Sequence, residues 1–119
     1  MSGFNTNAVE IEEYIREMAK KDRIKAFYPQ TISRKLNIPI DIVWAQLMTL
    51  SNQGGRIHLQ YEVKCLEDLN TLTTVEECKA IIGKELTCEI CGERIEVTYN
   101  NLYPIFRIDE EYKRCVKKK

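Results

Sequence analysis

The sequence predicts an α+β protein of two small parts, a mainly helical first part and a β-rich second part. Apolar residues recur at helical spacing through much of the first 52 residues, and a segment of strictly alternating apolar and polar residues follows. All five cysteines lie in the second half of the chain, two of them as a Cys-x-x-Cys pair. We therefore expect a first domain over residues 1–64 and a second over residues 65–119, and cysteine chemistry only in the second.

The composition supports a globular protein and limits its partners. The chain has 119 residues, 44% of them hydrophobic, and its 18 Lys and Arg residues balance 18 Asp and Glu residues. This balance disfavours a general nucleic-acid coat, because binding to phosphates needs a surplus of cations. We see no membrane span and no secretory signal, and the odd number of cysteines argues against a disulfide framework. The sequence therefore predicts a cytoplasmic protein with no membrane partner.

The first predicted element is a helix over residues 8–21. Asn7 is followed three residues later by Glu10, which is a capping pattern that starts helices. Ile11 and Ile15 then recur at the spacing that places apolar side chains on one helical face. This amphipathic pattern predicts a helix that covers a core.

The sequence next predicts a short strand over residues 24–28 and two helices, over residues 30–37 and 41–52. Pro39 interrupts the chain between the two helices, and Gly54-Gly55 ends the second one. The longer helix has its apolar residues on one face and is expected to pack on the same core.

The clearest predicted strand, over residues 56–65, completes a familiar order of elements. The run from Tyr28 to Ile57, in which a small helix ending in Leu-Asn-Ile turns into a helix carrying Leu-x-x-Leu, resembles a winged helix-turn-helix domain. The resemblance covers about residues 8–65. It implies a DNA-binding ancestry, with the helix over residues 41–52 in the position that enters the major groove.

The charges of that helix make DNA a weaker expectation than a protein partner. Residues 41–52 contain no Lys or Arg, whereas base recognition uses Arg, Lys, Asn or Gln and phosphate contacts use cations. Winged helices also dock proteins, so we expect docking or homodimerisation, with duplex DNA as the alternative partner. The candidate residues for contact with DNA or a partner are Arg34, Lys35, Gln46, Thr49 and Asn52.

The strongest chemical motif is Cys88-Glu-Ile-Cys91-Gly92, because two thiolates in such a tight turn can bind one zinc ion. Cys65-Leu-Glu-Asp68 occupies the register of a second pair, about 20 residues upstream. With this register, residues 60–108 resemble a zinc ribbon, with strands over residues 94–99 and 104–108.

Three outcomes remain open for the metal. Zinc can be held by Cys65, Asp68, Cys88 and Cys91, since a carboxylate is an acceptable ligand. Cys78, Cys115 or His58 can replace Asp68 as the fourth ligand. Alternatively, the metal is lost and an apolar core holds the ribbon together.

The remaining segments predict an inserted helix and a polar tail. Thr74-Val-Glu-Glu77 reads as a capping box, so we expect a helix that ends at Gly83 and has Cys78 as a small core residue. The tail from Asp109 has apolar residues at helical spacing, and its Cys115 is expected to be exposed.

No catalytic motif stands out, and we expect a non-enzyme. The sequence predicts a small interaction protein, an adaptor or regulator. Its two-part arrangement looks like the accessory modules of bacterial, prophage and defence-associated proteins. The alternative is a transcription regulator that binds DNA through its winged helix. The aromatic candidates for a contact surface are Tyr99, Tyr103 and Phe106. The alternative is that they form the core of a small sheet, and we expect at least Phe106 there.

Overall fold

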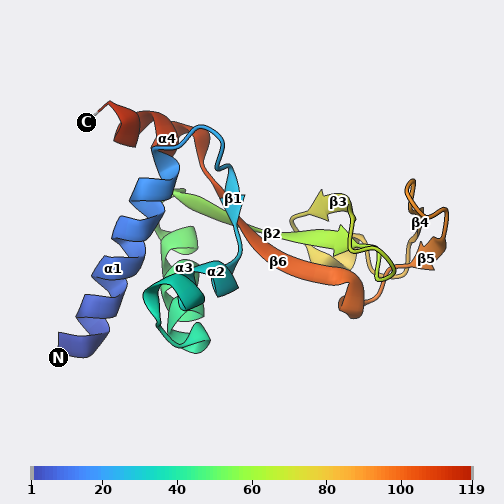
Figure 1. Ribbon diagram of the computed structural model, residues 1–119, viewed down its shortest axis with the longest axis horizontal. Helices are drawn as coiled ribbons and strands as arrows, with labels where there is room; N and C mark the ends of the chain where they lie inside the picture. The colour runs from blue at the N-terminus through green and yellow to red at the C-terminus, as the bar shows by residue number, and fades with distance from the viewer. Residues whose placement is uncertain (1, 119) are drawn as a thin grey trace. The chain divides into compact units, whose positions relative to one another are not determined.

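Four helices and six strands make up the chain in a computed structural model, which describes residues 2–118 and the side chains from residue 7 onward (Figure 1). This confirms the α+β class. The elements are α1 (Ser2–Ala19), β1 (Ala26–Phe27), α2 (Pro29–Leu36), α3 (Ile40–Gln53), β2 (Ile57–Lys64), β3 (Thr71–Val75), β4 (Glu85–Thr87), β5 (Arg94–Glu96), β6 (Leu102–Ile108) and α4 (Glu110–Lys117). Two single-turn 3₁₀ helices cover Cys78–Ala80 and Tyr99–Asn101.

The strands form two sheets. The larger has the order β1-β6-β2-β3, so β6, the last strand in the chain, lies between the first two (Figure 1). β1 is antiparallel to β6, with Phe27 opposite Phe106, and β2 is antiparallel to β3, with Tyr61 opposite Val75. The smaller sheet pairs β4 with β5.

The chain divides into two compact units, Met1–Leu59 with Phe106–Lys119 and Gln60–Ile105. This differs from the division that we expected between residues 64 and 65, because the end of β6 and all of α4 group with the first unit. The reason is burial: Lys113 and Val116 of α4 are both almost fully buried. These contacts could not be predicted from the polar composition of this segment.

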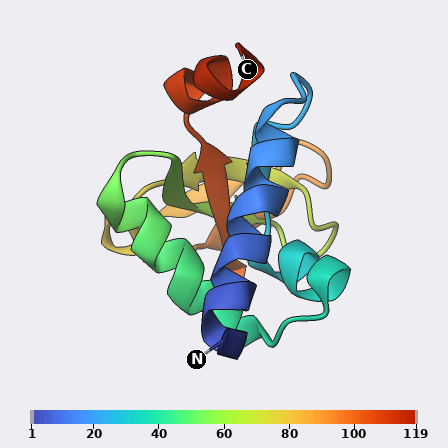
Figure 2. The ribbon, with the colours of Figure 1, turned by 90° about the vertical axis from the view of Figure 1, so that its left-hand side faces the viewer.

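The core of the first unit contains the apolar helical faces that the sequence patterns predicted. α1 packs against α2, α3 and α4 (Figure 2). At the centre, the Phe106 ring stacks on Phe27 at 5.9 Å and meets the edge of Trp44 at 5.6 Å between ring centroids. Phe106 is fully buried, as expected. Further buried side chains of this core include Ile11, Ile15, Ile32, Val43, Leu47, Ile57 and Ile108, each at most 2% exposed.

α4 is attached to the end of α1 by a buried lysine. The Lys113 ammonium donates hydrogen bonds to the backbone carbonyls of Lys21 and Ile24 at 2.8 and 2.6 Å. Burial lowers the pKa of Lys113. A cation at this place also suits the negative end of the α1 dipole.

The second unit has a much smaller core. Val63, Ile81 and Val97 are its buried apolar cluster, and four half-buried residues pack against it: Val75, Ile82, Leu86 and Leu102. Asn101, also buried, donates its side-chain amide to the Lys64 carbonyl at 2.9 Å. So small a core gives limited stability by itself.

Two sequence predictions fail in this second unit. The helix expected to end at Gly83 is wrong, since β3 extends to Val75 and only a single 3₁₀ turn, Cys78–Ala80, follows before Gly83. The β-branched run Thr71–Val75 favours a strand, and this preference outweighs the capping pattern. Cys78 is therefore half-buried rather than a core residue.

The strands expected for the zinc ribbon also differ. β5 covers only part of the predicted strand over residues 94–99, and it pairs with β4. That segment lies in β6, which extends into the first unit. No helix within residues 2–118 is long and apolar enough to cross a membrane.

Candidate metal centre

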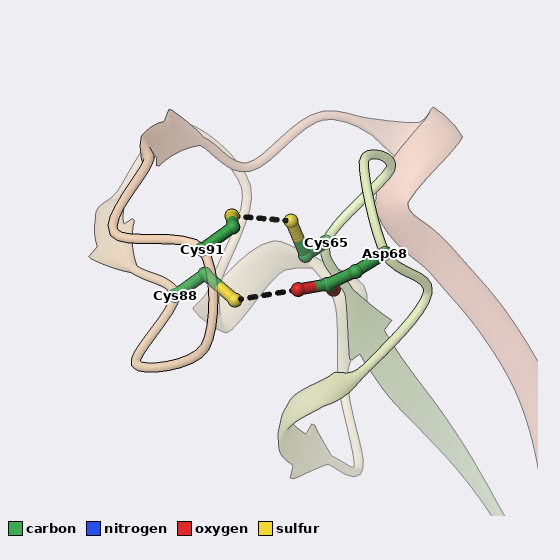
Figure 3. Close-up of side chains that lie close together, drawn as sticks. All are labelled: Cys65, Asp68, Cys88 and Cys91. Atoms are coloured by element: carbon green, nitrogen blue, oxygen red, sulfur yellow. Dashed lines mark hydrogen bonds between the residues drawn. The ribbon is translucent and has the colours of Figure 1, made fainter.

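Four side chains of the second unit converge on one point. The ligand atoms of Cys65, Asp68, Cys88 and Cys91 all lie within 4.8 Å of one another, close enough to hold a metal ion. Figure 3 shows the side chains pointing toward each other from two loops, one after β2 and one between β4 and β5. These are the four residues of the first sequence-based ligand set.

The two loops have the same backbone hydrogen bonds. In the first, the Leu69 amide donates to the Cys65 carbonyl at 2.7 Å and the Cys65 amide donates to the Asn70 carbonyl at 3.0 Å. In the second, Gly92 donates to Cys88 at 2.8 Å and Cys88 donates to Glu93 at 2.9 Å. The loops are therefore equivalent, with Asp68 in the place of Cys91.

The residue after the second ligand has a left-handed backbone in both loops. Gly92 has φ +79°, a conformation that costs glycine little. Leu69 takes φ +60° at the equivalent position. A side chain makes this conformation unfavourable by about 1–2 kcal/mol. The missing glycine thus leaves the shape of the first loop intact and imposes a local strain on it.

A carboxylate interaction reinforces the first loop. Asp68 Oδ1 accepts a hydrogen bond from the Asn70 amide at 3.0 Å, and Oδ2 accepts one from Cys88 Sγ at 3.4 Å. The Asn70 backbone amide, helped by thiol hydrogen bonds, lowers the pKa of Asp68 against the opposing effect of burial. Asp68 is therefore held as the carboxylate, the form that binds metals.

The thiols crowd each other. Cys65 Sγ lies 3.6 Å from Cys91 Sγ, and Cys65 and Cys88 are fully buried while Cys91 is exposed. The Glu93 backbone amide lowers the pKa of Cys91, but desolvation, hydrogen bonds with Cys65 and Cys88 and the charge of Cys65 together raise it to about 11. A cation at the centre would reverse this preference, because it stabilises thiolates.

The alternative fourth ligands, Cys78, Cys115 and His58, lie outside this cluster. His58 Nε2 lies 2.9 Å from Asp109 Oδ1, and Cys115 lies in α4, which belongs to the first unit. Cys78 interacts with the Tyr61 hydroxyl. Within the described residues, the only group of metal-binding side chains found is the one around Asp68.

The residues expected to contact DNA or a partner differ in their availability. Arg34 and Lys35 are exposed in the last turn of α2. Gln46 donates its amide to Glu12 at 3.3 Å, and the Thr49 hydroxyl donates to the Ala45 carbonyl at 2.9 Å. Asn52 is exposed at the end of α3.

Three exposed apolar residues of the two loops were not predicted from the sequence. Leu66, Leu69 and Ile90 have exposed fractions of 51%, 56% and 72%. Leu66 and Ile90 lie between the paired ligands, and Leu69 follows Asp68 directly. The sequence did contain a signal for their exposure, because large apolar residues beside metal ligands in a tight loop have little core to pack against.

The fold and the centre define the chain as an α+β protein with a four-donor candidate metal centre in its second unit. No protein-family model, no curated protein and no solved structure shows a significant match to the chain.

Proposed function

We propose that the chain is a non-catalytic protein-interaction protein whose second unit is a zinc-ribbon-like module held by a structural zinc ion. The observation that carries this proposal is the convergence of three sulfurs and one carboxylate from two equivalent loops. The chain supplies all four ligands, which is typical of structural rather than catalytic zinc.

The distances between the donor atoms support a tetrahedral ion. With Zn–S bonds of about 2.3 Å and a Zn–O bond of about 2.0–2.2 Å, tetrahedral geometry places two sulfurs about 3.8 Å apart and a sulfur and an oxygen about 3.5 Å apart. The corresponding distances here are 3.6 Å for Cys65 to Cys91 and 3.4 Å for Cys88 to Asp68. Zinc would fit with small adjustments of the side chains.

The small core explains why the second unit needs a metal. Only three apolar residues of its cluster are buried, so the hydrophobic contribution to folding is limited. Structural zinc contributes about 10–16 kcal/mol of apparent binding free energy in small zinc domains, which becomes folding free energy.

We infer that the tips of the two metal loops dock the protein partner. Leu66, Leu69 and Ile90 are exposed there, and large exposed apolar side chains that cluster favour interfaces. Glu67, Glu89 and Glu93 are exposed on the same loops and have no ion pair in the described part of the chain. The partner surface that fits is apolar and flanked by Lys or Arg.

We also propose that the first unit is a winged helix-turn-helix. In that interpretation, α2 and α3 form the helix-turn-helix, and β2 and β6 beside β1 are the wing strands, with residues 60–105 inserted between them. α3 has no cation, and its Gln46 and Thr49 are already hydrogen-bonded. These features favour docking or dimerisation over base recognition.

A DNA-binding regulator is the second candidate, and one observation favours it. Arg34 and Lys35 are exposed at the end of α2 and form no ion pair within residues 2–118. Phosphates could be contacted there. Gel shifts with random duplexes at low salt test this candidate: salt-sensitive binding that the double variant Arg34→Gln, Lys35→Gln abolishes would support it, and no binding would exclude it.

Metal analysis tests the zinc proposal. Protein purified without chelator should contain about one equivalent of zinc, and Cys88→Ser or Cys91→Ser should lose it. Cys78→Ser, outside the cluster, should keep the full content and serves as the matched control. Zinc below about a tenth of an equivalent in the unmodified chain would refute the structural site.

Partner capture with paired variants tests the docking surface. Ile90→Asp should lose bound proteins that Val9→Asp retains, since Val9 is an exposed apolar residue of α1 in the other unit. Both variants should keep the zinc content of the unmodified chain, which shows that the second unit is folded. Equal capture by both variants would contradict docking through the loop tips.

A further inference from the structure

We propose that a cavity in the first unit binds a small anion that carries a phosphate group. The cavity has a volume of about 390 Å³ and is lined by Arg16, Lys20, Arg56, Tyr112, Cys115 and Val116. Small-molecule sites usually have volumes of about 300–1,000 Å³. The site lies outside the metal-binding unit and does not depend on the zinc proposal.

Three cations and no acidic residue line the cavity. Arg16 and Lys20 lie one helical turn apart, at the end of α1 and just after it, and Arg56 directly precedes β2. The formal charge of the whole chain is zero, so this lining is a local concentration of positive charge. Several converging cations favour an anion with more than one negative charge.

The geometry holds one of these cations in place. The Arg56 guanidinium lies 5.9 Å from the centroid of the Tyr112 ring, and its Nη1 donates to Glu12 at 3.1 Å. An arginine has five N–H donors, so this ion pair leaves others for a ligand. A guanidinium fixed in this way can bind a phosphate with two parallel hydrogen bonds.

The other two cations have N–H donors that are free to bind a ligand. Lys20 donates one hydrogen bond to Glu17 at 3.1 Å, and the Arg16 side chain has no partner within the described residues. Neither Glu12 nor Glu17 lines the cavity. An anion in the cavity would meet the three cations directly, while these carboxylates pair with two of them from outside the cavity.

The chemistry of a phosphate monoester suits this lining better than that of a single carboxylate. At neutral pH such a phosphate has a charge of about −1.5 to −2 and three strong acceptor oxygens. The Tyr112 ring and the buried Val116 add apolar wall, against which an organic group would pack. We therefore assign a phosphorylated small molecule as the ligand class, with its phosphate at the cations.

Calorimetric titration with pyrophosphate at about 0.15 M salt tests the site, because screening at that salt concentration weakens unspecific attraction between exposed charges. Arg16→Gln should weaken binding by about tenfold, since it removes one charge-assisted contact of about 1.4 kcal/mol or more. Arg34→Gln is the control, because it removes the same charge from an exposed position outside the cavity.

Alkylation of Cys115 gives a second measurement. Cys115 is exposed and lines the cavity, whereas Cys78 lies in the other unit. Bound pyrophosphate should slow the reaction of N-ethylmaleimide with Cys115 and leave the rate at Cys78 unchanged, as followed by peptide mass spectrometry.

Four results would overturn the proposal. The first is no heat of binding together with no protection of Cys115. The second is an equal loss of affinity in Arg16→Gln and Arg34→Gln, which would show unspecific attraction. Succinate binding as tightly as pyrophosphate would replace the phosphate by a carboxylate ligand. Finally, a duplex that binds through Arg16 without competition from pyrophosphate would turn the cations into a nucleic-acid surface.

Discussion

At the scale of single residues, Asp68 combines two roles that the second metal loop divides between two residues. One carboxylate oxygen accepts the Asn70 amide and holds the turn, while the other faces Cys88 at the centre. In the second loop, Cys91 is only a candidate ligand, and Gly92 allows the turn by its conformational freedom. The first loop therefore relies on a carboxylate hydrogen bond where the second relies on glycine.

The strain at Leu69 can be relieved by substitution. Leu69→Gly should raise the free energy of unfolding of the second unit by up to about 1 kcal/mol, because relief of the left-handed backbone exceeds the added entropy of the unfolded chain. Denaturant titration of the zinc-loaded protein measures this change. Leu66→Gly is the control and should destabilise, since Leu66 has an ordinary backbone conformation. A loss of stability in Leu69→Gly would contradict the strain.

A second residue-scale prediction concerns Asp109, which caps α4 through Oδ2 and pairs with His58 through Oδ1. The hydrogen bond with His58, followed by backbone hydrogen bonds, lowers the pKa of Asp109 despite partial burial. A lowered carboxyl pKa stabilises the fold above the unfolded value of about 3.9, and this stability is lost as the pH falls through the folded value.

Asp109→Asn should therefore be less stable than the unmodified chain at pH 7, by about 1 kcal/mol, and the difference should shrink toward pH 3. Asparagine still caps helices, so the cap itself is largely preserved. Trp44, the single tryptophan, packs in the core of the first unit and reports its unfolding by fluorescence. A difference that stays constant from pH 7 to pH 3 would show that the His58 contact contributes nothing.

At the scale of elements, α4 completes the first unit by closing the end of α1. The Lys113 ammonium donates to the backbone carbonyls of Lys21 and Ile24, the first of which also accepts from the Ile24 amide. Val116, about one turn further along α4, is buried as well. A short polar helix thus becomes part of a core that was formed largely by residues about 60 or more positions earlier.

Lys113→Met should lower the unfolding free energy of the first unit by about 1–3 kcal/mol, because it removes two charge-assisted hydrogen bonds and leaves the Ile24 carbonyl without its side-chain donor. Arg114→Met is the matched control on the same helix, since Arg114 is exposed and pairs only loosely with Glu111. Its effect should stay below about 0.5 kcal/mol. Chemical unfolding followed by Trp44 fluorescence distinguishes the two. Equal effects would show that the hydrogen bonds of Lys113 are dispensable.

The elements also show how much of the fold could be predicted from the sequence. Two long periodic segments were predicted within a few residues, because burial of one face fixes both their type and their register: α3 was expected over residues 41–52 and β2 over residues 56–65. The start of α1 was wrong, since the helix expected over residues 8–21 begins at Ser2 and not at the capping pattern of Asn7. The short segments failed, since in them local patterns compete. A single 3₁₀ turn, Cys78–Ala80, stands where a helix was predicted, and β5 covers only half of its predicted strand.

The four residues of the candidate centre were predicted from their spacing alone. The backbone conformation of the two loops that carry them was not predicted. The Cys88 and Cys91 pair fixed the second loop, and the register of Asp68 to Cys65 fixed the first. The left-handed Leu69 could not be foreseen, because leucine has no local preference for that conformation and only the closed loop imposes it. The cationic cavity was equally hidden, since its residues come from α1, from the turn before β2 and from α4.

At the scale of the whole molecule, the chain leaves the first unit through β2, builds the second unit and returns through β6. Among the described residues, the first core cluster contains 14 buried apolar residues and the second contains three. The first unit can therefore be stable on hydrophobic grounds, whereas the second depends on its metal centre in our proposal.

Removal of the metal should thus unfold the two units separately. With a chelator at neutral pH, amide hydrogen exchange of residues 65–98 should rise to nearly the unfolded rate, while α1 and α3 keep their protection and Trp44 fluorescence stays unchanged. Added zinc should restore the protection, which separates metal loss from irreversible damage. Simultaneous loss of protection in both units would show one cooperative structure, and unchanged exchange in both would show that no metal stabilises the second unit.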